Sequence, residues 1–80
     1  MTLASMIYKY MAENNITQSQ LGNKLNIHRT AVNRIARGKY RPSKRLAHKI
    51  TMLIGSDAGI LCARELGLPD NYFIDNEIGD

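Results

Sequence analysis

Residues 28–45 (HRTAVNRIARGKYRPSKR) combine a cationic cluster with an apolar stripe. The segment holds seven lysines and arginines and no acidic residue. Ala31, Val32, Ile35 and Ala36 interrupt the charges at the spacing of one helical face. Guanidinium and ammonium groups bind phosphates, and a cluster of them attracts polyanions. The pattern therefore predicts a helix with one side packed on the protein and a cationic side offered to nucleic acid or an anionic membrane.

Charge and composition narrow the possible classes of protein. Residues 1–50 hold ten basic and one acidic side chains, whereas residues 51–80 hold one basic and six acidic ones. Eighty residues suffice for one small domain. Cys62 is the single cysteine, so we expect no internal disulfide and a small buried side chain. With no signal-peptide pattern or membrane-spanning apolar run, and no set of metal ligands, we expect a cytoplasmic protein without metal or cofactor.

Apolar periodicity and capping residues predict an all-α chain. An amphipathic helix is expected over residues 3–13 and a second over 18–25, where Thr17 and Gln20 form a capping box. A third is expected over 28–37, ended by Gly38. Two more follow: one opens at Pro42-Ser43, and one is capped by Ser56 or Asp57 and runs to Gly67.

The second and third helices are joined by a very short turn, and the third is basic on its exposed side. This is the arrangement of a helix-turn-helix. The stretch TQSQLGNKLNIHRTAVNRIARGKYRPS resembles the helix-turn-helix of the phage repressor and Cro family. Gly22 takes the small site where the two helices cross, whereas Asn26, His28 and Ala36 depart from the family pattern. The resemblance implies a compact four- to five-helix lambda-repressor-like domain over 1–67, with an acidic tail over 68–80.

Side chains that could read DNA bases gather on one side of the third helix. On a helical wheel they lie opposite the apolar stripe. Arginine can bond guanine, asparagine can bond adenine, and the threonine methyl can contact thymine in the major groove. The predicted base-reading residues are Arg29, Thr30, Asn33 and Arg34. The resemblance implies base contacts for Arg29, Thr30 and Arg34.

Groups that flank this helix are predicted to contact DNA phosphates. They are Gln18, His28, Arg37, Lys39, Tyr40, Arg41, Ser43 and Lys44. For Gln18, Arg41 and Ser43 the family pattern agrees. Two alternatives stay open: His28 is only a helix cap, or Tyr40 packs at the edge of the core. Arg45 can contact DNA or point away from it.

Members of this class usually bind as two-fold dimers on half-sites ~34 to 36 Å apart. The C-terminal third has more apolar side chains than a five-helix core needs. The predicted dimerisation residues are Leu61, Leu68, Tyr72, Phe73 and Ile74. The alternative is that this segment folds onto its own monomer.

The sequence therefore favours a DNA-binding transcriptional regulator, a Cro-like or short phage-type repressor that binds a palindromic double-stranded operator as a homodimer. The alternative is an antitoxin or anti-repressor whose C-terminal tail binds a partner protein. An enzyme is not expected, because no cluster of nucleophile, base and orienting acid is visible.

Overall fold

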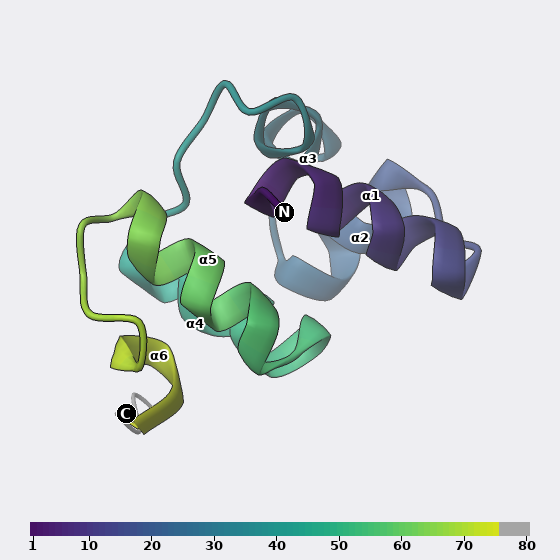
Figure 1. The fold of residues 1–80 in the computed structure, drawn as a ribbon. Helices are drawn as coiled ribbons and strands as arrows, with labels where there is room; N and C mark the ends of the chain where they lie inside the picture. Colours follow the sequence, from purple (N-terminus) through teal and green to yellow (C-terminus); the bar gives the residue numbers. More distant parts are fainter. Residues whose placement is uncertain (76–80) are drawn as a thin grey trace. The chain divides into compact units, whose positions relative to one another are not determined.

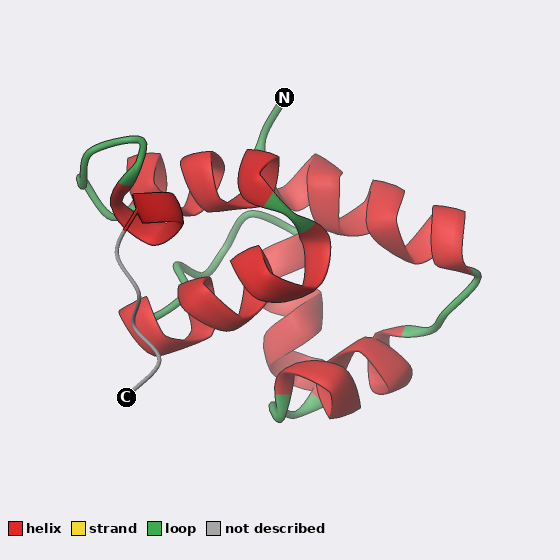
Figure 2. Cartoon of the chain, turned by 90° about the horizontal axis from the view of Figure 1, so that it is seen from below, coloured by secondary structure: helices red, strands yellow, loops and turns green. Residues whose placement is uncertain are grey.

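The computed structural model describes residues 1–75, and these residues contain helices and loops but no strand (Figures 1 and 2). The helices are α1 (Leu3–Asn14), α2 (Gln18–Leu25), α3 (Arg29–Ala36), α4 (Lys44–Ile54), α5 (Ser56–Glu65) and α6 (Tyr72–Asp75). The predicted all-α class is confirmed. Contacts gather into two units, Met1–Tyr40 and a second that begins at Arg41, and each is described by itself.

Local hydrogen bonds cap helix α1 at both ends. Thr2 and Ser5 form a capping box at its start. Asn15 ends it in the left-handed conformation with φ 53°, which asparagine tolerates better than most residues. Its buried side chains lie at the i, i+4, i+8 spacing of one helical face. That face packs on α3 within the first unit.

Helix α2 begins with the predicted capping box. The Gln20 amide donates to Thr17 Oγ1 at 3.1 Å, and the Thr17 amide donates to Gln20 Oε1 at 2.8 Å. The helix ends at Asn26, which is left-handed with φ 59°. The Ile27 amide then donates to the Gly22 carbonyl at 2.8 Å. These bonds close the short turn that leads into α3.

Helices α2 and α3 cross closely because position 22 has no side chain. A Cβ atom built on Gly22 would lie 2.6 Å from the Ile27 carbonyl oxygen, which is backbone and cannot swing aside. Leu21 and Leu25 of α2 and Val32 and Ile35 of α3 are buried. The burial of these four side chains fixes the rotation of α3 about its own axis, and that rotation decides which residues α3 exposes.

In the second unit, α4 starts at the predicted cap: Ser43 Oγ accepts from the Leu46 amide at 3.1 Å. The cap predicted for α5 is wrong. Gly55, with φ 130°, is its N-cap and makes no side-chain capping bond, and Ser56 is already helical. Helices α4 and α5 meet at Gly59, where a Cβ atom would lie 2.8 Å from Thr51 Cγ2.

The sequence did not predict α6, which packs on α4 and α5. The loop before it is held by the Arg64 guanidinium, which donates from Nε and Nη2 to the Asp70 carboxylate at 3.1 and 2.9 Å. Phe73 is buried and meets the Tyr72 ring edge-on, with ring centroids 4.9 Å apart. Whether 1–67 and 68–80 are separate parts stays a prediction. Among residues 1–75, no helix is long and apolar enough to cross a membrane.

Candidate nucleic-acid interface

Helix α3 has one buried and one exposed side, as its sequence predicts. Val32, Ile35 and Ala36 are buried, whereas Arg29 and Arg34 are exposed. Thr30 and Arg37 are also exposed. The predicted helix 28–37 includes both caps, since His28 is the N-cap and Arg37 the C-cap. The side chains that the sequence marks as base readers therefore lie opposite the stripe that packs on α1 and α2.

His28 caps α3 through its ring. Nδ1 accepts from the Thr30 amide at 3.1 Å and also lies within hydrogen-bond distance of Thr30 Oγ1. A nitrogen that accepts from an amide carries no proton, so in the neutral ring the proton sits on Nε2. His28 is exposed, and Nε2–H is a donor that the cap does not use. One side chain can thus hold the helix start and donate to an acceptor outside the protein.

Asn33 is joined to the start of α2. Its Nδ2 donates to Gln18 Oε1 at 3.4 Å, and both side chains are half-buried. The sequence placed Gln18 among the phosphate contacts and Asn33 among the base readers without linking them. The bond leaves the Gln18 amide nitrogen and Asn33 Oδ1 for other partners. Two helices therefore share one polar contact at the edge of the exposed surface.

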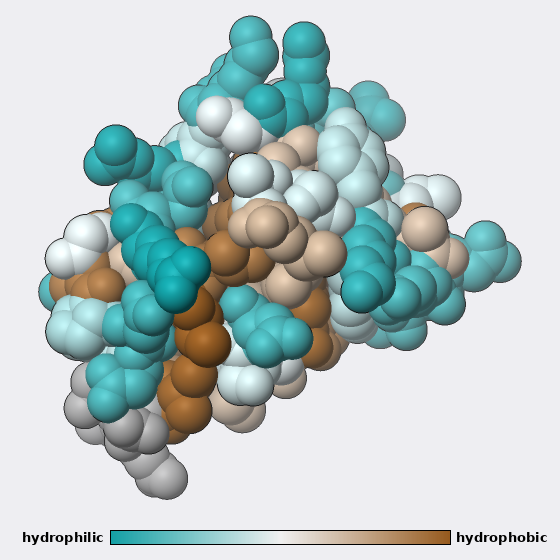
Figure 3. All heavy atoms as spheres, viewed as in Figure 1, coloured by the Kyte–Doolittle hydropathy of each residue, from teal (hydrophilic) through white to brown (hydrophobic). Residues whose placement is uncertain are grey.

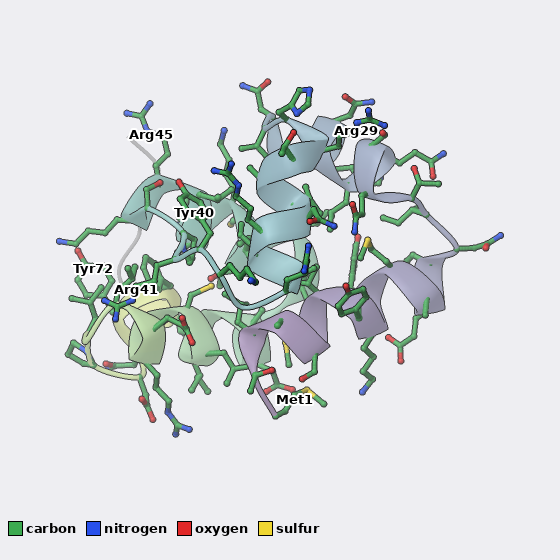
Figure 4. All side chains as sticks on the ribbon, turned by 90° about the horizontal axis from the view of Figure 1, so that it is seen from above. Met1, Arg29, Tyr40, Arg41, Arg45 and Tyr72 are labelled. Atoms are coloured by element: carbon green, nitrogen blue, oxygen red, sulfur yellow. The ribbon has the colours of Figure 1, made fainter. Side chains whose placement is uncertain are left out.

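Tyr40 lines a cavity together with two of the predicted base readers, Thr30 and Arg34. A cavity of about 300 Å³ is lined by His28, Thr30, Ala31, Arg34 and Tyr40. Figure 4 shows Tyr40 and Arg29 on different sides of α3. The Tyr40 side chain is 45% exposed. Two predicted base readers and two predicted phosphate contacts thus surround one hollow, which no local pattern in the sequence indicates.

The first unit is strongly cationic. Residues 1–40 carry six lysines and arginines and a single acidic residue, Glu13. Within the described part of the chain, Arg29, Arg34 and Arg37 form no ion pair with a carboxylate. Their guanidinium groups are therefore available for phosphates or for guanine.

The other predicted phosphate contacts belong to the second unit. The Ser43 hydroxyl is engaged in capping α4. Lys44 Nζ lies 5.5 Å from the centroid of the Tyr72 ring, a cation-π distance. Arg41 and Arg45 are exposed and extend in different directions in Figure 4. The contact between Lys44 and Tyr72 joins a predicted phosphate-binding residue to one assigned to dimerisation.

The predicted dimerisation residues differ in exposure. Ile74 is 43% exposed, and Leu61, Leu68 and Tyr72 are half-buried. Phe73 is only 3% exposed, so its side chain offers almost no surface to a partner and belongs to the core instead. Apolar side chains gather over α5 and beside α6 in Figure 3. The segment thus folds partly onto its own chain and keeps part of its apolar surface exposed.

Comparison with known proteins agrees with this geometry. The sequence profile of a helix-turn-helix family matches residues 7–61, which is more than half of the chain and includes α2 and α3. An uncharacterized HTH-type transcriptional regulator of Methanocaldococcus jannaschii is 44% identical over 46 residues, which cover 58% of this chain and 70% of that protein. No solved structure is significantly similar.

These matches define the class as helix-turn-helix proteins of the phage repressor and Cro type, which are lambda-repressor-like. The chain belongs to this family and is a DNA-binding transcriptional regulator. The resemblance noted from TQSQLGNKLNIHRTAVNRIARGKYRPS is thereby confirmed.

Proposed function

We propose that this regulator represses transcription by laying α3 in the major groove of a palindromic operator, as a homodimer of the phage-repressor kind. The observation that carries the proposal is the exposed row of Arg29, Thr30 and Arg34 opposite the buried face of α3. An α-helix fits the major groove of B-DNA, where each base pair presents a distinct pattern of donors and acceptors. A repressor of this kind acts by occupying promoter DNA.

The predicted base readers on α3 differ in the base that each can bond. Arg29 and Arg34 can each make paired hydrogen bonds to guanine O6 and N7. Asn33 can bond adenine while Gln18 holds one of its amide hydrogens. The same bond leaves the Gln18 amide nitrogen to donate to a phosphate beside the groove. The Gln18–Asn33 pair would then couple binding of a DNA phosphate to reading of a base.

Phosphate contacts supply affinity without sequence preference. In the first unit the proposed donors are Gln18, the His28 Nε2–H, Arg37, Lys39 and the Tyr40 hydroxyl. In the second unit they are Arg41, Ser43 and Lys44. Each neutralised phosphate releases counterions, so the logarithm of affinity should fall with the logarithm of salt concentration by about 0.9 per contact.

A dimer would double the number of base pairs read. The proposed contact surface consists of Leu61, Leu68, Tyr72 and Ile74, whose side chains keep some exposure. The apolar surface over α5 and beside α6 supports this choice (Figure 3). The described part of this surface carries few cations. It would therefore gain little electrostatic attraction from contact with DNA.

The test is to select bound duplexes from a random pool with the full chain, then to footprint the enriched sequence. The proposal expects a palindrome whose half-sites lie ~34 to 36 Å apart on one face of the helix. Sedimentation with and without the duplex measures the number of chains bound. Enrichment of a single half-site with one chain bound would reject the dimer, and no enrichment would reject specific reading.

A further inference from the structure

The C-terminal segment contacts one of the proposed phosphate donors. Lys44 is the first residue of α4, and its Nζ lies 5.5 Å from the centroid of the Tyr72 ring. At that distance an aromatic face attracts an ammonium group. Both side chains belong to the second unit, so the contact joins α4 to α6 within one part of the fold. Neither the docking of α3 in the major groove nor the proposed dimer surface accounts for this contact.

The Tyr72 ring is held in place by its own segment. It meets the Phe73 ring edge-on, with centroids 4.9 Å apart, and Phe73 is buried. The Tyr72 amide donates to the Pro69 carbonyl at 2.9 Å. The Arg64–Asp70 ion pair, at 2.9 Å, holds the loop before it. The ring is therefore a fixed support, whereas an exposed lysine side chain without such a support takes many rotamers.

An aromatic ring can hold an ammonium group without neutralising it. A carboxylate in the same place would cancel the charge and compete with a phosphate for the N–H donors. The ring has no net charge, and it covers only one side of a group that carries three donors. Among the side chains that the structure describes, Lys44 forms no ion pair with a carboxylate. The charge of Lys44 therefore remains available to a phosphate while the ring holds the side chain.

We propose that Tyr72 is a positioning residue for DNA binding, because its ring holds the Lys44 ammonium group in place for a backbone phosphate. The proposal rests on the proposed phosphate contact of Lys44 and extends it to a residue that does not touch DNA. Binding then costs less side-chain entropy, since the lysine is already restricted in the free protein. The gain cannot exceed the strength of the cation-π contact, which at an exposed site corresponds to about two- to fivefold in affinity.

The test measures the affinity of the full chain for a random-sequence duplex, where binding depends on phosphate contacts. Three changes at position 72 separate the aromatic face from apolar bulk. Tyr72→Ala should bind about two- to fivefold more weakly, because Lys44 is no longer held. Tyr72→Leu keeps an apolar side chain for packing but has no aromatic face, and it should bind as weakly as Tyr72→Ala. Tyr72→Phe keeps the ring and should bind like the unchanged chain.

A second comparison determines whether the effect of Tyr72 depends on Lys44. Lys44→Met keeps the apolar stem and removes the charge, so in that background Tyr72→Ala should cause no further loss of affinity. The matched control is Arg45→Met. Arg45 is the next residue of α4, is exposed, and makes no cation-π contact within the described part of the chain. In the Arg45→Met background, Tyr72→Ala should weaken binding by the same factor as in the unchanged chain.

The results distinguish positioning from the dimer contact proposed for the same residue. If Tyr72→Leu keeps full affinity, or if Tyr72→Ala adds its full loss to that of Lys44→Met, packing or dimer formation explains the effect and the proposal fails. Tighter binding by Tyr72→Ala would mean that the ring withholds Lys44 from DNA, and it would overturn the proposal. So would unchanged binding by all three variants. If Tyr72→Ala unfolds, the comparison of Tyr72→Leu with Tyr72→Phe decides.

The two proposals can fail separately. Because a random duplex requires no operator, the affinities of the Tyr72 variants are informative even if selection yields no consensus and operator repression is rejected. If a consensus appears but the Tyr72 variants bind like the unchanged chain, positioning alone is rejected. If Lys44→Met binds the random duplex as tightly as the unchanged chain, Lys44 makes no phosphate contact, and positioning is rejected together with that contact.

Discussion

Two single residues that depart from the family pattern, Asn26 and His28, form the turn between α2 and α3. Asn26 ends α2 in the left-handed conformation, and His28 starts α3 by accepting the Thr30 amide. Both residues complete hydrogen-bonded caps, because asparagine tolerates the left-handed region and an imidazole nitrogen can accept as a serine hydroxyl does.

The capping role of His28 can be measured. His28→Ala removes the acceptor for the Thr30 amide and should lower the free energy of unfolding by about 1 kcal/mol. His28→Ser supplies another cap and should recover most of that loss. Urea unfolding followed by circular dichroism compares the three proteins. Equal stabilities for the alanine and serine variants would mean that the ring does not cap α3.

At the scale of elements, the crossing of α2 and α3 depends on Gly22. Alanine favours a helix over glycine by about 1 kcal/mol. Here a Cβ atom would meet the Ile27 carbonyl oxygen at 2.6 Å. We therefore expect Gly22→Ala to lower the free energy of unfolding by about 1 to 3 kcal/mol.

A matched control for Gly22→Ala is Ser19→Ala, on the exposed side of the same helix. Because helix propensity is its main effect there, this change should be neutral or slightly stabilising. Thermal unfolding compares both variants with the unchanged chain. A Gly22→Ala protein that is as stable as Ser19→Ala would show that α3 can shift to accept a methyl group.

A contact between a lysine and an aromatic ring helps to dock α6 on α4. Lys44 Nζ lies over the Tyr72 ring at 5.5 Å. A double-mutant cycle of Tyr72→Ala and Lys44→Ala should give a coupling free energy of about 0.5 to 1 kcal/mol. Tyr72→Phe keeps the ring and should keep the coupling. A coupling near zero would assign α6 docking to Phe73 and the Arg64–Asp70 pair alone.

At the scale of the whole molecule, local patterns predicted some features and missed others for physical reasons. The Thr17–Gln20 box and the Ser43 cap depend on residues three apart, so the sequence shows them directly. Helix α6 has four residues and no periodicity, and only the burial of Phe73 marks it. The cavity beside Tyr40 and the Lys44–Tyr72 contact join segments that are separate in the chain. The base and phosphate contacts assigned to individual residues stay predictions.

Burial of Cys62 makes the free energy of unfolding depend on pH. Burial, and then the charge of Glu65, raise the pKa of the thiol from 9.0 to about 12. Above pH 9 the unfolded chain therefore releases a proton that the folded chain keeps, and the free energy of unfolding falls as pH rises. Urea unfolding at pH 7 and pH 10 should show a larger loss for the unchanged chain than for Cys62→Ala. If the free energy of unfolding falls equally in the two proteins, the Cys62 thiol does not cause the pH dependence.

One comparison of variants distinguishes base reading by the cationic side of α3 from non-specific attraction to DNA. Affinities of Arg34→Ala and Lys39→Ala are measured on the selected operator and on a scrambled duplex, at two salt concentrations. Arg34→Ala should lose about 1 to 3 kcal/mol on the operator and little on the scrambled duplex. Lys39→Ala should weaken both alike and reduce the salt slope by about 0.9. If Arg34→Ala weakens both duplexes equally, α3 does not read bases through Arg34.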